Sequence, residues 1–438
     1  MKLRPFRGYR YNSAKVPDLS RVVAPPYDQI DPETRESLHA LHPWNFVRIT
    51  LGRPEPGDTG EADRHRRARE HLVRSLAEEI LIRDPEPAVY PYLTTYRAGG
   101  ETLSRMGLIA LGELTEYAEG VVLPHERTHA GPKAERLRHL EATGADTGLI
   151  FMLASDPAGD LLRAAAPPRT PPLAVARDLK DELHQLWRIT DRAAIARIQT
   201  LMAGRRLIIA DGHHRYETAL AYRRRHPGAD FKLMAVFPLE APGITIFPTH
   251  RLLHNVEGFD AGALLAQAGR WFQIERGPVF SDPAAEAGAL MAALDARIRS
   301  GALAVAMVAG ADGPGWLLTL SPEAFDAVPW PPGTSRSWRR LAVSVLHEAL
   351  LKPVIGITEE ILRAQRCVDY TAGAPEAVAL VRKGSYQAGF LIPATTPEEL
   401  QAVVRAGEVL PQKSTFFYPK LLDGLVFSRL GEETEGSA

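Results

Sequence analysis

Hydrophobic and polar residues follow two different periods over the first 255 residues. Short apolar runs predict strands at residues 88–97, 105–114, 148–155, 183–190, 206–210, 231–237 and 243–253. Apolar residues recur at the spacing of amphipathic helices at residues 61–81, 133–143, 191–202 and 216–225. Because strands and helices are interspersed, this part of the chain predicts a mixed α/β fold.

The pattern changes after about Asn255, which indicates a second domain. Alanine-rich helices are predicted at 261–272 and 284–301, and a hairpin with an ADGPG turn at 303–321. We therefore predict a core domain over residues 1–255, a second, smaller α/β domain over 256–405, and a C-terminal segment over 406–438 that returns to the core. Its tail, GEETEGSA, is predicted to be disordered.

Length, charge and cysteine content narrow the class of protein. A chain of 438 residues exceeds the usual size of one hydrophobic core. With 52 basic and 53 acidic residues the net charge is -1, which disfavours nucleic acid as a partner and requires any phosphate to be held locally. The single Cys367 fits a reducing compartment. Because neither a secretion signal nor an apolar run of about twenty residues is found, we expect a cytoplasmic protein without a membrane partner.

The segment LIIADGHHRYETAL, residues 207–220, places polar residues where a strand is predicted to turn into a helix. Amides at a helix start carry partial positive charge, glycine lets a phosphate approach the backbone, and Arg215 can add a bidentate contact. His213 is a candidate base. The candidate phosphate-binding residues of this turn are Asp211, Gly212, His214 and Arg215.

Two other interpretations of this turn remain open. Asp211 could simply cap the helix while the histidines fill space. A zinc site fits less well, because adjacent histidines point apart on a helix and histidine ligands normally come four residues apart. Polar residues crowded at the end of a buried strand are costly to explain by packing alone, which favours a functional role.

A second polar segment, VLPHERTHAGPKAERL, spans residues 122–137 and leads into a predicted helix. Glu126 offers a carboxylate for proton transfer, and Lys133 lies in the first turn of the helix, within reach of a ligand at its entrance. The candidate phosphate-binding residues here are Arg127, His129 and Lys133. The alternative is a solvated charged loop. We expect this loop and the turn at 211–215 to meet in one cleft.

The early segment VVAPPYDQ presents Asp28 after two prolines, which stiffen its approach. A rigidly held carboxylate suits a general base or a Mg²⁺ ligand. The alternative is an ordinary turn in which Asp31 caps the next helix.

A C-terminal segment, LPQKSTFFYPKLLDGL, begins at Leu410 and combines lysine, hydroxyl and aromatic side chains. Its candidate phosphate-binding residues are Lys413, Ser414 and Thr415. The upstream glycines of a P-loop are absent, so this is not a Walker motif. The aromatic residues fit a stacked base or a buried cluster equally well. We predict that the segment folds back onto the first domain and joins its site.

These motifs carry two resemblances. ADGHHRYETALAY resembles the Gly-x-x-Arg phosphate-binding signature of the ParB and sulfiredoxin superfamily. Together with the other three segments, it resembles a conserved bacterial and archaeal family that is distantly related to free-serine kinase. The resemblance implies a ParB/sulfiredoxin-like core, and Asp28 is the position most similar to the acidic residue that acts as base on the hydroxyl in free-serine kinase.

We therefore hypothesise phosphoryl transfer between ATP or ADP and a small hydroxyl metabolite, with free serine first among the acceptors. Mg²⁺ is the expected cofactor, because it bridges nucleotide phosphates. The candidate catalytic residues are Asp28, Glu126 and His213. The alternatives are a nucleotide-binding regulatory or ParB-like module, and hydrolysis of a phosphate ester at the same site. The sequence does not determine the oligomeric state.

Overall fold

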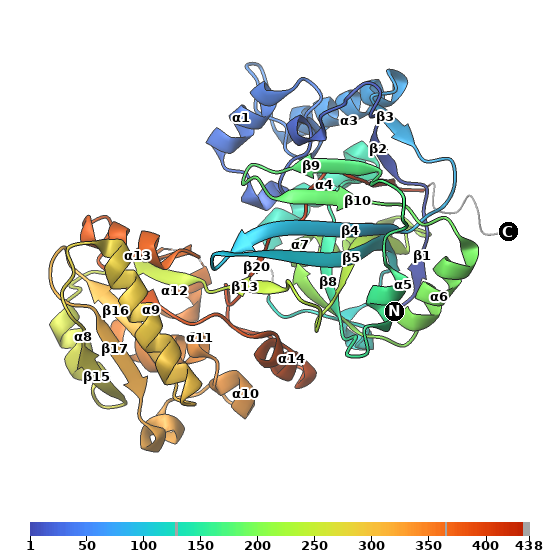
Figure 1. Ribbon diagram of the computed structural model, residues 1–438. Helices are drawn as coiled ribbons and strands as arrows, with labels where there is room; N and C mark the ends of the chain where they lie inside the picture. The colour runs from blue at the N-terminus through green and yellow to red at the C-terminus, as the bar shows by residue number, and fades with distance from the viewer. Residues whose placement is uncertain (128–129, 364–365, 432–438) are drawn as a thin grey trace. The chain divides into compact units, whose positions relative to one another are not determined.

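The computed structural model describes residues 1–127, 130–363 and 366–431 (Figure 1). The chain divides into two compact units, a first unit of Met1–Thr245 with the chain from Pro419 onward, and a second unit of Ile246–Tyr418. Residues 432–438, for which disorder is predicted, lie outside the described residues. Among the described residues, no helix combines the length and the apolar composition that crossing a bilayer requires.

The first unit contains thirteen strands and seven α-helices among its described residues. The strands are β1 (Leu3–Arg4), β2 (Tyr9–Tyr11), β3 (Leu81–Arg83), β4 (Tyr90–Ala98), β5 (Glu101–Glu113), β6 (Val122–Leu123), β7 (Ala145–Asp146), β8 (Ile150–Ala154), β9 (Ala174–Arg177), β10 (Leu183–Leu186), β11 (Leu207–Asp211), β12 (Phe231–Pro238) and β21 (Ser428–Arg429). The helices are α1 (Pro32–Leu41), α2 (Val47–Thr50), α3 (Glu61–Ala77), α4 (Ala130–Thr143), α5 (Asp160–Ala164), α6 (Arg192–Met202) and α7 (His213–Arg225), with short 3₁₀ turns η1 (Leu19–Arg21), η2 (Tyr27–Gln29) and η3 (Tyr117–Glu119).

A nine-stranded mixed sheet forms the centre of this unit, in the order β6-β11-β8-β12-β5-β4-β10-β9, and β1 also pairs with β5 (Figure 1). The pairs β6–β11 and β8–β12 are parallel, and the other neighbours are antiparallel. All eight residues of β12 are buried, as the near-continuous apolar run of a central strand predicts. The mixed α/β fold that the sequence predicts is confirmed.

Helix α6 shows how the apolar pattern becomes packing. The Asp191 side chain caps its start by accepting the Ala194 amide at 2.7 Å. Its apolar face then buries Ile195, Ile198 and Met202 in the same core as the inward side chains of the sheet. Each of these buried side chains contributes about 2 kcal/mol to stability. The helix predicted at 191–202 is thereby confirmed.

The chain from Pro419 onward runs through the first unit. Ala24 and Asp423 form an antiparallel bridge, as do Tyr9 and Phe427, and β21 pairs with β7. The buried Arg105 adds a further connection, because its Nη2 donates to the Pro419 carbonyl at 2.8 Å. These contacts hold the C-terminal segment beside parts of the first unit that lie more than two hundred residues earlier in the chain.

The second unit is built on a six-stranded antiparallel sheet, in the order β15-β17-β16-β19-β14-β18, with a separate β13–β20 pair. Its strands are β13 (Thr245–Phe247), which begins at the boundary, β14 (His250–Leu253), β15 (Phe272–Arg276), β16 (Ala304–Ala309), β17 (Trp316–Leu320), β18 (Val368–Thr371), β19 (Ala388–Leu391) and β20 (Phe416–Tyr418). Its helices are α8 (Ala261–Ala268), α9 (Pro283–Arg299), α10 (Arg336–Arg339), α11 (Ala342–Val345), α12 (Glu359–Arg363), α13 (Ala374–Arg382) and α14 (Pro397–Arg405), with η4 (Pro322–Ala327) and a π-helix, η5 (Leu346–Ile355).

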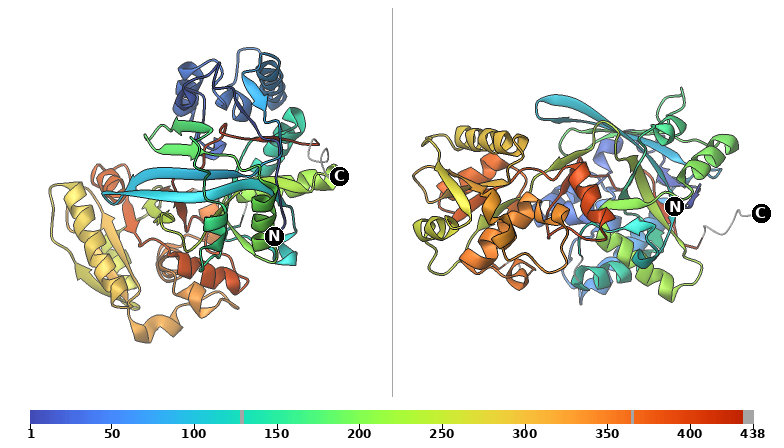
Figure 2. Two further views of the ribbon diagram at one scale, coloured as in Figure 1. Left: turned by 45° about the vertical axis from the view of Figure 1, so that its right-hand side comes forward. Right: turned by 90° about the horizontal axis from the view of Figure 1, so that it is seen from below.

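Helices α9 and α13 pack together on one face of this sheet (Figure 2). The predicted hairpin at 303–321 is confirmed as β16 and β17. In the first unit, the helix predicted at 61–81 ends at Ala77, and Leu81 begins β3. Two predicted elements of the second unit also differ from the structure. The strand predicted at 243–253 is split into β13 and β14 around Pro248, which has no amide to donate to a ladder. The helix predicted at 261–272 ends at Ala268, and Phe272 begins β15 instead.

Candidate functional site

The turn between β11 and α7 brings an arginine back over a glycine. Gly212 has a φ of 98°, a left-handed conformation that favours glycine. Arg215, one helical turn later, donates from Nη2 to Asp211 Oδ2 at 2.5 Å. A Cβ atom on Gly212 would lie 3.2 Å from Arg215 Cζ. The positive φ therefore favours glycine here, and a side chain at this position would also press on the arginine that crosses the turn.

Arg215 is buried and held from two sides. Its Nη1 donates to the Leu149 carbonyl, and a Cβ on Gly148 would lie 3.1 Å from Arg215 Cδ. Burial acts to lower the pKa of Arg215, but the carboxylates of Asp211 and Asp28 outweigh it and raise that pKa above its ordinary value. The guanidinium is therefore a fixed positive charge inside the first unit.

Asp211 joins two cations. In addition to Arg215, Lys420 Nζ donates to Asp211 Oδ1 at 2.7 Å. Burial acts to raise the pKa of Asp211, but Lys420 and Arg215 hold it well below its ordinary range. The structure corrects the interpretation of Asp211 as a helix cap, because Gly212 occupies the N-cap position and no side chain caps α7.

Two histidines connect this turn to the loop that follows β6. The His125 amide donates to His213 Nε2 at 3.2 Å, and His125 Nδ1 lies 2.5 Å from the Ile209 carbonyl oxygen. The two rings meet edge to face with centroids 4.6 Å apart. Burial lowers the pKa of both rings, and that of His213 lies well below its ordinary value. Both imidazoles are therefore neutral at pH 7, and His213 uses its Nε2 lone pair to bind the loop.

The other candidates of this loop are placed as follows. Lys133 forms an ion pair with Glu217 on α7, so it reaches the helix that follows the turn. Glu126 is half-buried and Arg127 is exposed, and His214, on α7, is half-buried. His129 lies outside the described residues. The loop approaches the turn, as expected, through the His125 amide, which donates to His213.

A cavity of about 60 Å³ lies beside α7, large enough for several water molecules. We call it the Arg215 cavity. Its lining residues, all in the first unit, are Tyr27, Thr50, Arg136, His139, Leu140, Ala145, Asp146, Thr147, Gly148, Arg215, Thr218, Ala219, Lys232 and Asp423.

Two further cations line this cavity. Lys232 Nζ pairs with Asp146 and donates to the Gly148 carbonyl at 2.6 Å. Arg136 Nη1 donates to the Thr50 carbonyl at 2.8 Å, and its guanidinium carbon lies 4.3 Å from the centroid of the Tyr27 ring. Each cation is thus fixed by protein groups before any ligand enters.

Asp423 is the carboxyl group that distinguishes this cavity. It is 3% exposed, and its Oδ1 has no hydrogen-bond partner among the described residues. Burial raises the pKa of Asp423 to about 8, because the opposing effects of Arg215 and Lys232 are too small to cancel it and Asp28 adds to it. The group is therefore mostly protonated at pH 7. Sequence reasoning missed Asp423, although a lone acid inside the apolar run LLDGLVF is a usable signal.

Asp28 lies in η2, next to the cavity residue Tyr27. It is exposed, and its charge acts on both Arg215 and Asp423. Asp31 caps α1 by accepting the Thr34 amide at 2.7 Å, as the alternative interpretation of this segment stated. That capping does not involve Asp28, which remains a candidate base or Mg²⁺ ligand.

Lys413, Ser414 and Thr415 belong to the second unit. The Lys413 carbonyl accepts from Arg251 Nη2 at 3.0 Å, and Ser414 Oγ donates to the Pro411 carbonyl at 2.5 Å. Their role in phosphate binding stays a prediction. The lysine of this segment that reaches the turn at Asp211 is Lys420.

A group with metal-binding potential lies at the β9–β10 hairpin. Asp178, Glu182 and His184 each offer one ligand atom, and these atoms lie within 4.8 Å of one another. His184 Nδ1 also lies 2.6 Å from the Tyr92 hydroxyl. None of these residues lines the Arg215 cavity.

Comparisons with known proteins place the chain in a family. No curated protein matches it. A conserved hypothetical protein from Pyrococcus furiosus is 14% identical, with 72% of this chain and 93% of that chain covered and a TM-score of 0.36. A free serine kinase in complex with AMP is 14% identical, with coverages of 72% and 92% and a TM-score of 0.37. C-terminally truncated SbnI from Staphylococcus aureus is 13% identical, with coverages of 75% and 90% and a TM-score of 0.35. The family model described as protein of unknown function DUF1015 matches residues 3–328, and the chain belongs to this family.

Proposed function

We propose that the first unit binds a nucleotide by its phosphates at the Arg215 cavity and transfers a phosphoryl group between ATP or ADP and a small hydroxyl metabolite. Free serine is the first acceptor to test, because the sequence motifs resemble a family related to free-serine kinase. One observation carries the proposal. Three cations, Arg136, Arg215 and Lys232, line a single cavity. The carboxyl group of Asp423 lines it with them, and its Oδ1 has no hydrogen-bond partner among the described residues.

Phosphoryl transfer suits this arrangement because it depends on positioning and on stabilising negative charge rather than on covalent chemistry. Arg215 and Lys232 are already oriented by protein acceptors, so little reorganisation is needed when a phosphate arrives. In its protonated form, Asp423 can donate a hydrogen bond to a phosphate oxygen. The amides at the start of α7 precede the first intrahelical bond, from Tyr216 to Gly212, and add partial positive charge.

The acceptor hydroxyl needs a base, and Asp28 is our candidate. Its exposed carboxylate can also hold a Mg²⁺ ion, which would neutralise charge on the nucleotide phosphates. Asp146 is less suited to either role, because Lys232 and the Leu233 amide occupy its two oxygens. Asp28, which lies next to the cavity rather than in its lining, is therefore the carboxylate that we propose for Mg²⁺.

The test combines binding and turnover. Purified protein is incubated with ATP or ADP, Mg²⁺ and serine or other hydroxylated metabolites, and products are identified by mass spectrometry. Nucleotide affinity is measured by calorimetry for the wild type and for Arg215→Met. We expect affinity to fall about tenfold to a hundredfold, the scale of a charge-assisted hydrogen bond.

Arg223→Met is the matched control. Arg223 also lies on α7 and also bonds to one carbonyl, that of Leu114, and one carboxylate, that of Glu116. It does not line the cavity, so its loss should leave nucleotide affinity unchanged. Equal effects of the two substitutions would remove Arg215 from the site. Nucleotide binding without turnover of any acceptor would favour a regulatory module.

A further inference from the structure

A second and larger cavity lies in the first unit, between α1, α2 and α3. It measures about 300 Å³ and we call it the Arg48 pocket. Four arginines, two histidines and two glutamates are among its lining residues, which are His39, Arg48, Gly52, Arg53, Glu55, Arg67, Glu70, His71 and Arg74. No residue lines both this pocket and the Arg215 cavity.

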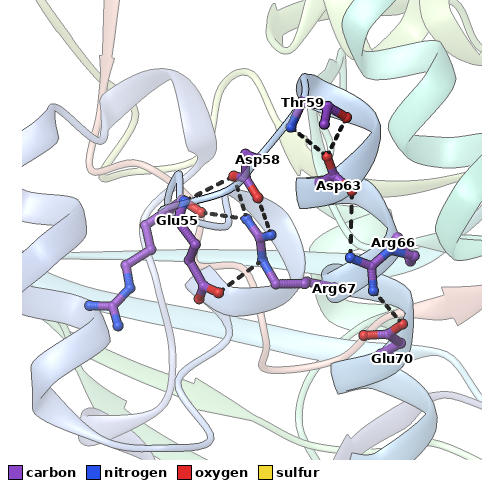
Figure 3. A network of polar contacts seen from close by, with 8 residues as sticks. Glu55, Asp58, Thr59, Asp63, Arg66, Arg67 and Glu70 are labelled. Atoms are coloured by element: carbon purple, nitrogen blue, oxygen red, sulfur yellow. Dashed lines mark hydrogen bonds and ion pairs between the residues drawn. The ribbon is translucent and has the colours of Figure 1, made fainter.

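The acidic residues near the Arg48 pocket are engaged by two arginines of α3 (Figure 3). Arg67 donates to both oxygens of Asp58, and its Nε lies 3.7 Å from Glu55. Arg66, outside the lining, donates to Glu70 at 2.9 Å. Both lining glutamates therefore already have arginine partners. Arg53 lies 3.4 Å from Glu36 and Arg74 lies 3.9 Å from Glu78, but both pairs are exposed and hold their charges weakly. Four arginines against two glutamates leave positive charge in excess in the lining.

Arg48 shows the effect of this excess charge. Its Nη2 donates to the His39 carbonyl at 2.7 Å, whereas its buried Nε has no hydrogen-bond partner among the described residues. Burial lowers the pKa of Arg48, and the neighbouring Arg53 and Arg74 lower it further. A negatively charged ligand would relieve this repulsion.

Both histidines have buried ring nitrogens without a hydrogen-bond partner among the described residues. His39 is 6% exposed, and neither of its ring nitrogens has a hydrogen-bond partner among the described residues. The buried Nε2 of His71 also has none. Burial, followed by nearby arginines, lowers the pKa of each ring to about 4. Because buried polar groups are normally hydrogen-bonded, unsatisfied ring nitrogens on two residues that line the same cavity point to a ligand.

We propose that the Arg48 pocket is a second anion site, which binds the phosphate group of a small molecule through Arg48, Arg53 and Arg74. Arginine guanidinium groups match phosphate oxygens in pairs, which gives both charge and geometry. His39 and His71 add ring nitrogens at the wall of the pocket. Its volume accommodates more than inorganic phosphate alone, so a phosphorylated metabolite is the expected ligand class.

Calorimetry with inorganic phosphate, pyrophosphate and O-phosphoserine tests the proposal. It is performed on Arg215→Met protein, so that the Arg215 cavity contributes little. We expect Arg48→Gln and Arg53→Gln each to weaken binding about tenfold. Arg53 is exposed, so its substitution keeps the test valid if Arg48→Gln fails to fold. Tighter binding of O-phosphoserine than of inorganic phosphate would identify an organic phosphate as the ligand.

Arg69→Gln is the control. Arg69 is exposed on α3, the helix that also carries Arg74, and it lies outside the lining of the pocket. Its substitution therefore removes the same charge without changing the pocket. The affinity of this variant for the three phosphates should stay within about twofold of that of the Arg215→Met protein, because salt screens a remote surface charge. The proposal is overturned if none of the three phosphates binds to Arg215→Met protein, or if Arg53→Gln and Arg69→Gln weaken binding equally.

Discussion

Asp211 and Lys420 form an ion pair with 2.7 Å between Oδ1 and Nζ, although 209 positions separate them in the chain. Asp211 ends the strand that leads into the glycine turn, and Lys420 lies in the segment that returns from the second unit. Because Asp211 also accepts from Arg215, one carboxylate fixes both the C-terminal segment and the arginine of the proposed site. We therefore expect stability and the proposed nucleotide binding to be coupled at this residue.

The first prediction tests how much this ion pair contributes to stability. Lys420→Met should lower the free energy of unfolding by about 1–3 kcal/mol, because it removes a partner from a mostly buried carboxylate. In a double-mutant cycle with Asp211→Asn, measured by urea unfolding, we expect a coupling energy of about 0.5–3 kcal/mol. Lys2→Met, which breaks the exposed pair of Lys2 with Glu113, is the control and should change little. Strictly additive effects of the two substitutions would show that the pair does not stabilise the fold.

The second prediction separates backbone strain from displacement of Arg215. Gly212→Ala and Gly204→Ala both place a side chain at positive φ and should each cost about 1–2 kcal/mol. A Cβ at Gly204 meets nothing within 4 Å, whereas one at Gly212 lies 3.2 Å from Arg215 Cζ. Only Gly212→Ala should therefore weaken nucleotide binding in calorimetry. Equal nucleotide affinities for the two variants would contradict the role of the turn.

The third prediction concerns the base. Asp28→Asn should reduce turnover of the identified acceptor by about 10²–10⁴-fold, with nucleotide affinity nearly unchanged, because the amide cannot accept the hydroxyl proton. Asp31→Asn is the matched control, since asparagine caps a helix as well as aspartate does and Asp31 only caps α1. Full turnover by Asp28→Asn would exclude Asp28 as the base.

The fourth prediction follows from the raised pKa of Asp423, about 8 in the folded protein against an ordinary value of 3.8. The folded state binds a proton more tightly than the unfolded state, so this group's contribution to stability is complete below about pH 4 and is lost as the pH rises through 8. Asp423→Asn mimics the neutral form of the group. Its free energy of unfolding should rise relative to that of the wild type between pH 5 and pH 9, because only the wild type loses this stabilising contribution as the pH increases.

Urea unfolding at a series of pH values measures this difference. Asp295→Asn makes the same chemical change at an exposed position on α9 and serves as the control. Parallel stability profiles for the wild type and Asp423→Asn would show that the buried carboxyl does not titrate near neutral pH.

Local sequence determined much of the secondary structure. Strands β4, β5, β8, β11 and β12 were predictable because short apolar runs mark them in the sequence. Helices α6 and α9 were predictable because their hydrogen bonds are local in the chain and their apolar residues recur at helical spacing. The glycine turn at 212 was predictable for the same reason, since a strand, a glycine and a helical spacing are adjacent in sequence. The start of α7 at His213, three residues before the predicted start, was not, because polar residues in a first turn do not follow the apolar period.

Tertiary structure alone decided which side chains surround Arg215. Lys232 lies on β12, whereas Lys420 and Asp423 lie on the C-terminal segment. Nothing local to either segment indicates that they meet, because their proximity depends on strand order and on the return of the C-terminal chain. Burial also decided their chemistry. An aspartate in the segment LLDGL has no unusual property by itself, and its pKa of about 8 arises only when the fold removes water and places it near other charges.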